Sequence, residues 1–202
     1  KEHRVVATCD IDETRLEYFT NAHFSKYETL PTKYLDWKDL LADPEVEAVY
    51  ILTPNYSHYE ITMDALRADK HVFCEKPITV NYALSCEMAE EAERRGKILN
   101  IGVCNRYHKS VEMLREMNER GEFGNIYHVY CSFRAHRGIP GLGGAFTTKA
   151  IAGGGTLIAW GVHYLDIVMY CTGDPQPLTV SGKAFCKLGK DRKNYVYESM
   201  WS

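Results

Sequence analysis

The amino-acid sequence predicts an α/β protein: a doubly wound parallel sheet, followed by an α+β domain with an open, mostly antiparallel sheet. Two observations lead to this prediction. In the first half, short apolar runs alternate with segments whose apolar residues recur at helical spacing, as in strands joined by crossover helices. In the second half, two segments alternate strictly between apolar and polar residues, as antiparallel strands with one solvated face do. We expect the domain boundary at Cys104, between residues 1–104 and residues 105–202.

The first half reads as strands and helices in turn. Val5 to Cys9 is a short apolar run, and helical spacing begins after Asp12, whose carboxylate suits a helix N-cap. The later strands are expected at Val49 to Leu52, His71 to Cys74 and Ile98 to Val103, with helices from about Ser57 to Leu66 and from about Asn81 to Arg95. Parallel strands joined by right-handed crossovers end at one edge of their sheet, and ligands bind outside that edge.

The second half changes pattern. A helix that ends at Gly121 leads to an alternating segment from Tyr127 to Arg134, and a second alternating segment runs from Val180 to Leu188. These two segments are the predicted antiparallel strands. Between them, the glycines 153–155 precede an unusually apolar helix from Thr156 to Cys171. Glycines at such a point let the backbone approach a ligand or another element closely.

Composition narrows the class of partner. Of 202 residues, 45% are hydrophobic and 25% are charged, as in ordinary globular proteins. The net charge is −3 and Lys and Arg form no long runs, so we expect no nucleic-acid partner, and no apolar run suggests a membrane span. The seven cysteines are scattered and never spaced as Cys-x-x-Cys, which indicates reduced thiols in a cytoplasmic protein without a zinc site or disulfides. A small molecule is the expected ligand.

Polar residues follow the first two strands. Asp10 follows the first, where an acidic side chain can accept hydrogen bonds from the ribose hydroxyls of a dinucleotide; the alternative is a turn or helix-cap residue. Thr53 and Asn55 follow the second strand, with His58 shortly after them. A hydroxyl and an amide there can hold a pyrophosphate or a ribose, whereas the alternative is a proline turn capped by Ser57.

The next two strands also end in polar residues. Glu75-Lys76-Pro77 closes the strand that begins at His71. A partly desolvated lysine at a ligand-binding edge can hydrogen-bond a substrate hydroxyl or carbonyl, and the alternative is an ordinary surface turn. Asn105-Arg106-Tyr107 closes the last strand, where the alternative is a domain linker whose arginine forms a salt bridge.

A histidine on the apolar helix is the second candidate for chemistry. Ala159, His163 and Asp166 lie at helical spacing along one stripe, which brings Asp166 within reach of the histidine. A neutral imidazole can take the proton from an alcohol while a hydride leaves its carbon. The alternative is a core histidine whose hydrogen bonds are satisfied internally.

These motifs, in this order, resemble the Gfo/Idh/MocA family of NAD(P)-dependent oxidoreductases, which includes glucose–fructose oxidoreductase and inositol dehydrogenase. The resemblance covers nearly the whole chain and rests on five segments: Asp10, Thr53-Pro54-Asn55 with His58, Glu75-Lys76-Pro77, Asn105-Arg106-Tyr107, and residues 153–166. It implies a Rossmann domain followed by a domain whose open sheet mediates homo-oligomerisation.

The resemblance also implies roles for individual residues. Lys76 would orient the substrate, and His163 would act as the base during hydride transfer to nicotinamide. The implied cofactor is NAD, with NADP possible, and no metal is implied; an acid at Asp10 favours NAD by repelling a 2′-phosphate. The implied cofactor-binding residues are Asp10, Thr53, Asn55, His58, Glu75, Lys76 and Asn105, and the implied substrate-binding residues are Lys76, Arg106, Tyr107 and His163.

Three departures from the family pattern bear on activity. Lys1 begins roughly where the second Rossmann strand is expected, so the first strand and the glycine-rich phosphate loop are missing from this sequence, and Ser202 falls before the remaining sheet strands. The family pattern also places an aspartate four residues before the histidine, where this chain has Ala159. Asp166 could support His163 instead, from the next turn.

The leading hypothesis is oxidation of a secondary hydroxyl of a sugar, cyclitol or glycoside by NAD. One alternative is a catalytically inactive relative that binds a dinucleotide or a sugar, which Ala159 motivates. Another is a redox-neutral glycosidase that uses NAD transiently. A third is that the polypeptide is only a piece that cannot bind the cofactor by itself.

Overall fold

A computed structural model describes residues 3–134 and 144–186. The chain forms two compact units, Lys1–Gly102 and Val103–Ser202.

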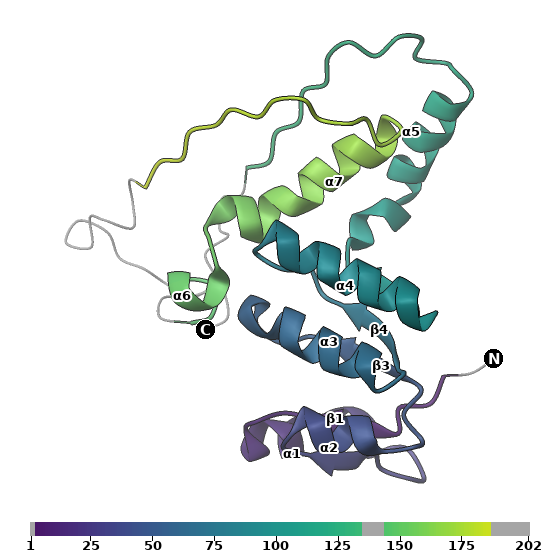
Figure 1. The fold of residues 1–202 in the computed structure, drawn as a ribbon, viewed down its shortest axis with the longest axis vertical. Helices are drawn as coiled ribbons and strands as arrows, with labels where there is room; N and C mark the ends of the chain where they lie inside the picture. The colour runs from purple at the N-terminus through teal and green to yellow at the C-terminus, as the bar shows by residue number, and fades with distance from the viewer. Residues whose placement is uncertain (1–2, 135–143, 187–202) are drawn as a thin grey trace. The chain divides into compact units, whose positions relative to one another are not determined.

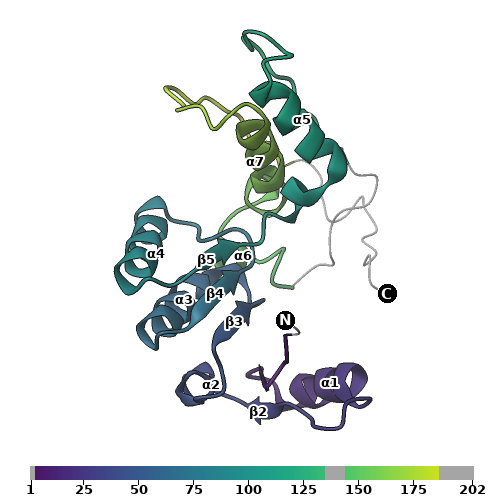
Figure 2. The same cartoon turned by 90° about the vertical axis from the view of Figure 1, so that its right-hand side faces the viewer.

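The described residues of the first unit contain five strands in two parallel sheets. Strands β1 (Ala7–Cys9) and β2 (Thr32–Tyr34) form one sheet. Strands β3 (Ala48–Ile51), β4 (His71–Cys74) and β5 (Leu99–Ile101) form the other in that order, with all three parallel (Figure 2). The predicted parallel sheet is therefore confirmed. The short β2 was not anticipated, because its three residues carry no apolar run.

Four α-helices accompany these strands in the described residues; three were predicted near their observed positions, whereas α2 was not anticipated. Asp12 caps α1 (Glu13–Phe24) by accepting hydrogen bonds from two backbone N–H groups of its first turn. Asn81 caps α4 (Tyr82–Arg95) in the same way, and Gly96 ends it in the left-handed conformation. The other two helices are α2 (Trp37–Ala42) and α3 (His58–Arg67), and α3 follows a 3₁₀ turn, η1 (Asn55–Ser57).

The core of this unit lies between the three-stranded sheet and its helices. α3 packs against β3 and β4, and α4 packs beside α3 (Figure 1). Ala65 and Leu66 of α3 are fully buried, and so are Val72 and Cys74 of β4, which face them from the sheet. Burial of this apolar face fixes β3 and β4 in register, and with them the segments that follow both strands.

The second unit is built mainly from helices in the described residues. A 3₁₀ turn, η2 (Cys104–Tyr107), leads into α5 (Lys109–Glu119); α6 (Lys149–Ala152) precedes a π-helical turn, η3 (Leu157–Gly161), and α7 (Val162–Cys171). α5 and α7 pack side by side (Figure 1).

The antiparallel sheet predicted for this unit is not formed in the described part of the chain. Residues 126–134 and 176–186 have no regular secondary structure, and they pair neither with each other nor with another described segment. Residues 187 and 188 of the second predicted strand lie outside the described residues. Alternation of apolar and polar residues predicts an extended backbone, whereas a ladder also requires a partner strand in register.

One helical segment departs from the expectation of no membrane-spanning element. Within the described residues, Lys149–Cys171 is long and apolar enough to cross a membrane, with a mean hydropathy of 1.2. It is not one continuous helix, because Gly153 ends α6 at a φ of 74°. Its last part, α7, packs on α5 and carries Asp166, which is ion-paired with Arg106.

Candidate active site

Thr53, Pro54 and Asn55 form the turn between β3 and α3. Ser57 folds back over this turn, with its hydroxyl 2.8 Å from the Thr53 hydroxyl oxygen and 2.8 Å from the Pro54 carbonyl oxygen. Ser57 therefore stabilises the turn itself, and its side chain accepts no hydrogen bond from the first turn of α3, contrary to the expected capping role. Asn55 is half-buried and begins η1.

His58 lies directly beneath this turn. Its side chain is buried, with 1% exposure. Nε2 lies 2.8 Å from the Thr53 carbonyl oxygen, and Nδ1 lies 2.7 Å from the Pro77 carbonyl oxygen. Both ring nitrogens are thus directed at main-chain carbonyls, and a contact between His58 and the cofactor stays a prediction. The imidazole instead connects the segment after β3 to the segment after β4.

Glu75, Lys76 and Pro77 follow β4, and a glycine makes room for the first of them. The Glu75 carboxylate accepts a hydrogen bond of 3.0 Å from the Lys76 backbone N–H. It also lies against Gly102, just beyond β5: a Cβ atom at that position would be 2.9 Å from Glu75 Oε1. Lys76 is half-buried and joins Pro77 through a cis peptide bond. A side chain at position 102 would therefore displace the end of the Glu75 side chain.

Asp10 follows β1 and is half-buried. Its Oδ1 accepts a hydrogen bond of 2.8 Å from the Asp12 backbone N–H, and its own N–H donates to the Tyr34 carbonyl oxygen. Asp10 thus serves as a turn residue, which was the alternative interpretation. Its position after a parallel strand also suits the predicted contact with a ribose, and that contact remains a prediction.

Arg106 of η2 forms an ion pair with Asp166 of α7. The arginine donates from Nε to Oδ2 at 2.8 Å and from Nη2 to Oδ1, and its guanidinium lies 4.8 Å from the centre of the Tyr170 ring. The hydrogen bonds to Asp166 raise the pKa of Arg106. Arg106 thus forms the salt bridge that was its alternative interpretation, and its contact with substrate stays a prediction. The partner in this salt bridge is Asp166.

His163 lies in the first turn of α7, immediately after the π-helical turn η3. Its ring centre is 6.5 Å from that of Trp160. Ala159 lies within η3. A continuous α-helix was expected here, whereas π-helical turns often occur at functional sites. The run of glycines before this turn was the available sequence signal. The structure shows a close contact at one of them, since a Cβ atom on Gly154 would lie 2.5 Å from the Ile158 side chain.

The remaining candidates lie on η2. Asn105 is half-buried and its carbonyl oxygen accepts a hydrogen bond from the His108 backbone N–H. Tyr107 is 73% exposed. The structure thus groups the candidates by unit: Thr53, Asn55, Glu75 and Lys76 follow neighbouring strands of the first unit, whereas the 105–107 turn and α7 belong to the second.

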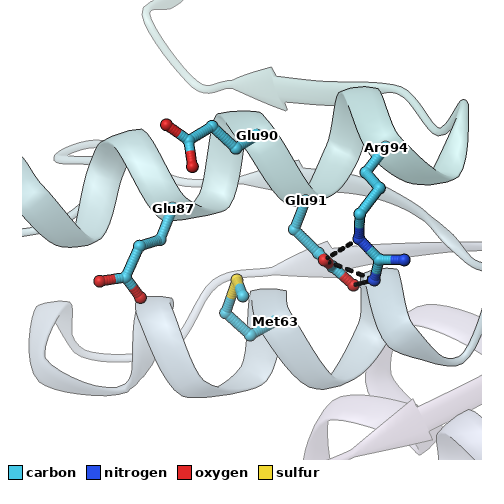
Figure 3. A pocket seen from close by; sticks show the side chains of 5 residues that line it. All are labelled: Met63, Glu87, Glu90, Glu91 and Arg94. Atoms are coloured by element: carbon cyan, nitrogen blue, oxygen red, sulfur yellow. Dashed lines mark hydrogen bonds and ion pairs between the residues drawn. The ribbon is translucent and has the colours of Figure 1, made fainter.

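A shallow groove between α3 and α4 is distinct from these strand ends. It has a volume of about 270 Å³ and is lined by Met63 and by Glu87, Glu90, Glu91 and Arg94 of α4 (Figure 3). Glu91 already accepts hydrogen bonds from Arg94 (Figure 3). Among residues 3–134 and 144–186, no group of three or more His, Cys, Asp or Glu side chains is placed to hold a metal ion.

Comparison with known families assigns both units. Residues 1–103 match the GFO_IDH_MocA model, described as an oxidoreductase family with an NAD-binding Rossmann fold. Residues 111–194 match the GFO/IDH/MocA C-terminal domain.

Individual relatives agree with these matches. D-glucoside 3-dehydrogenase of Escherichia coli K12 is 33% identical over 190 residues, which are 91% of this chain and 54% of the relative. Inositol 2-dehydrogenase of Salmonella typhimurium LT2 is 38% identical over 128 residues, or 62% of this chain and 37% of the relative. The structure of levoglucosan dehydrogenase in complex with NADH and levoglucosan superposes with a TM-score of 0.68 at 26% identity, covering 82% of this chain and 44% of that one. The chain thus spans about half the length, or less, of these relatives.

Proposed function

The chain belongs to the GFO/IDH/MocA family of NAD-binding oxidoreductases, and from this premise we propose that the whole protein oxidises a secondary hydroxyl of a sugar, cyclitol or glycoside. Relatives named as D-glucoside 3-dehydrogenase and inositol 2-dehydrogenase support this substrate class. The observation that carries the proposal is the placement of Lys76 after β4, beside the Thr53 turn that follows β3. In an open parallel sheet, ligands bind outside the carboxyl ends of such strands.

The residues around this edge fit a dinucleotide. Thr53 and Asn55 supply a hydroxyl and an amide after one strand, and Glu75 supplies a carboxylate after the next. Asp10, after β1, supplies an acceptor for ribose hydroxyls. NAD, when bound, accepts the hydride. NADP is the second candidate cofactor, and the acid at Asp10 favours NAD.

Two side chains perform the proton chemistry in this proposal. The Lys76 ammonium donates a hydrogen bond to the substrate hydroxyl oxygen, which orients the alcohol and stabilises the negative charge that develops there. His163 takes the hydroxyl proton as the C–H hydride leaves the same carbon, so that a carbonyl forms and the imidazole becomes protonated. Asn105 and Tyr107 are proposed to contact cofactor and substrate respectively.

The experiment that tests this proposal is NADH formation by the whole protein with a panel of sugars, inositols and glycosides. Turnover with a member of the panel would support a dehydrogenase and would identify the substrate class. Cleavage of a glycoside without net NADH accumulation would indicate a redox-neutral glycosidase instead. We also expect a homo-oligomer in the cytoplasm, which size-exclusion chromatography with light scattering and cell fractionation would test.

Ala159 favours a second candidate function. A family aspartate at this position would supply a carboxylate close to the histidine, and alanine cannot. A protein that binds NAD or a sugar tightly without turnover, and that Ala159→Asp does not activate, would be a binding or oligomerising relative. Turnover that appears only in Ala159→Asp would indicate a disabled dehydrogenase.

A further inference from the structure

We propose that His58 is a positioning residue that fixes the spacing between the Thr53 turn and the Lys76-Pro77 segment, and so aligns the cofactor-binding residues with the lysine. The inference rests on the proposed function, because it assigns His58 a task in the same site. It assigns this histidine a different task from the cofactor contact that the sequence suggested.

The ladder between β3 and β4 does not by itself set this spacing. The last paired residues are Ile51 and Cys74, and the backbone N–H of Glu75 donates the final hydrogen bond, of 2.9 Å, to the Ile51 carbonyl oxygen. Thr53 and Pro77 lie two and three residues past that pair. The His58 ring bridges them, at 2.8 Å from one carbonyl oxygen and 2.7 Å from the other.

Both contacts are to main-chain carbonyls, so the ring holds the backbones of the two segments rather than single side chains. His58 is 1% exposed and is the first residue of α3. The buried face of α3 packs on β3 and β4. The position of His58 is therefore set by the core. A neutral imidazole has one N–H and donates to one of the two carbonyls, whereas an imidazolium has two N–H groups and donates to both.

The amide side chains offer a way to separate the two contacts. The Asn amide nitrogen is as many bonds from Cα as His Nδ1, and the Gln amide nitrogen as many as His Nε2. His58→Asn therefore keeps a donor to the Pro77 carbonyl and releases the Thr53 turn. His58→Gln keeps a donor to the Thr53 carbonyl and releases the Lys76-Pro77 segment.

The test compares these two variants in the whole protein. We expect His58→Asn to raise the NAD dissociation constant about tenfold or more, because it frees the turn that carries Thr53 and Asn55. We expect His58→Gln to bind NAD nearly as the wild type does, and to lose kcat/KM for the alcohol by a similar or larger factor, because small misplacements of a catalytic group are costly. Ile61→Ala, a buried change on the same helix, controls for lost stability without altering either contact.

A split between the two variants would support positioning. Parallel losses that follow the fall in melting temperature, as in Ile61→Ala, would overturn it and leave His58 a core residue. If the wild type binds NAD but oxidises no substrate, the proposed function fails. The positioning role is then decided by the ratio of the NAD dissociation constants of His58→Asn and His58→Gln. A ratio near one would overturn the positioning role. If the wild type does not bind NAD, both proposals are overturned.

Discussion

Arg106 and Asp166 are 60 residues apart in sequence and form a two-point ion pair that joins the turn η2 to the helix α7. The Asp166 side chain is only 14% exposed, so this pair is better shielded than a surface salt bridge. α7 also carries His163 in its first turn. The pair therefore anchors the helix that holds the proposed base.

We expect that breaking this pair destabilises the second unit. Asp166→Asn and Arg106→Met should each lower the free energy of unfolding by about 1–3 kcal/mol, because each leaves a partly buried charged group without its partner. The double variant should lose less than the sum. A thermodynamic cycle from chemical denaturation measures the coupling, and Asp174→Asn, which removes a more exposed partner of Arg115, serves as the comparison. Strict additivity would contradict a direct interaction.

Lys76 and His163 should be required for turnover but not for folding. Lys76→Met removes the ammonium that orients the alcohol, and His163→Asn removes the base, so each should lower kcat by about 10²–10⁴-fold. Steady-state NADH formation measures the loss, and circular dichroism checks the fold. Lys38→Met changes an exposed lysine on α2 and should retain wild-type activity. Wild-type kcat in Lys76→Met would remove the lysine from the mechanism.

Gly102→Ala should displace the Glu75 carboxylate. The new methyl carbon would lie 2.9 Å from Glu75 Oε1, at the end of a flexible side chain, so we expect the carboxylate to shift at a cost of at most about 1 kcal/mol in stability, together with weaker NAD binding. Gly155→Ala is the matched control, since nothing lies within 4 Å of a Cβ atom there. Combining Gly102→Ala with Glu75→Ala should relieve the clash. If Gly102→Ala melts at the wild-type temperature and binds NAD normally, the contact is not restrictive.

Glu91 should make the first unit sensitive to acid. Its side chain is 10% exposed, and hydrogen bonds from Arg94 hold the pKa of its carboxyl below the ordinary value. A lowered carboxyl pKa contributes stability that is present above the unfolded-state pKa and is lost as pH falls through the folded-state value. Glu91→Gln should therefore unfold with a shallower pH dependence in the acidic range than the wild type. Glu90→Gln, an exposed change on the same helix, should follow the wild-type curve.

Local patterns predicted the elements of the first unit well. The strand His71–Cys74 was predicted at its observed bounds. The strands near Val49 and Ile98 were predicted within one or two residues of the observed bounds at both ends. The cap Asp12 and the start of the helix near Asn81 were also predicted. Each depends on a few neighbouring residues: an apolar run, a side-chain acceptor, or a glycine that tolerates a positive φ. The order of motifs further indicated the family.

The sequence by itself thus determined the parallel βαβ arrangement, the edge at which Lys76 lies and the family, because these follow from periodicity and from short motifs. Only the tertiary structure decided what the side chains do there. It placed His58 between two carbonyls, set the Glu75 carboxylate against Gly102, and paired Asp166 with Arg106. These contacts join residues that are distant in sequence, so they depend on how packed elements meet in space, which local patterns do not record.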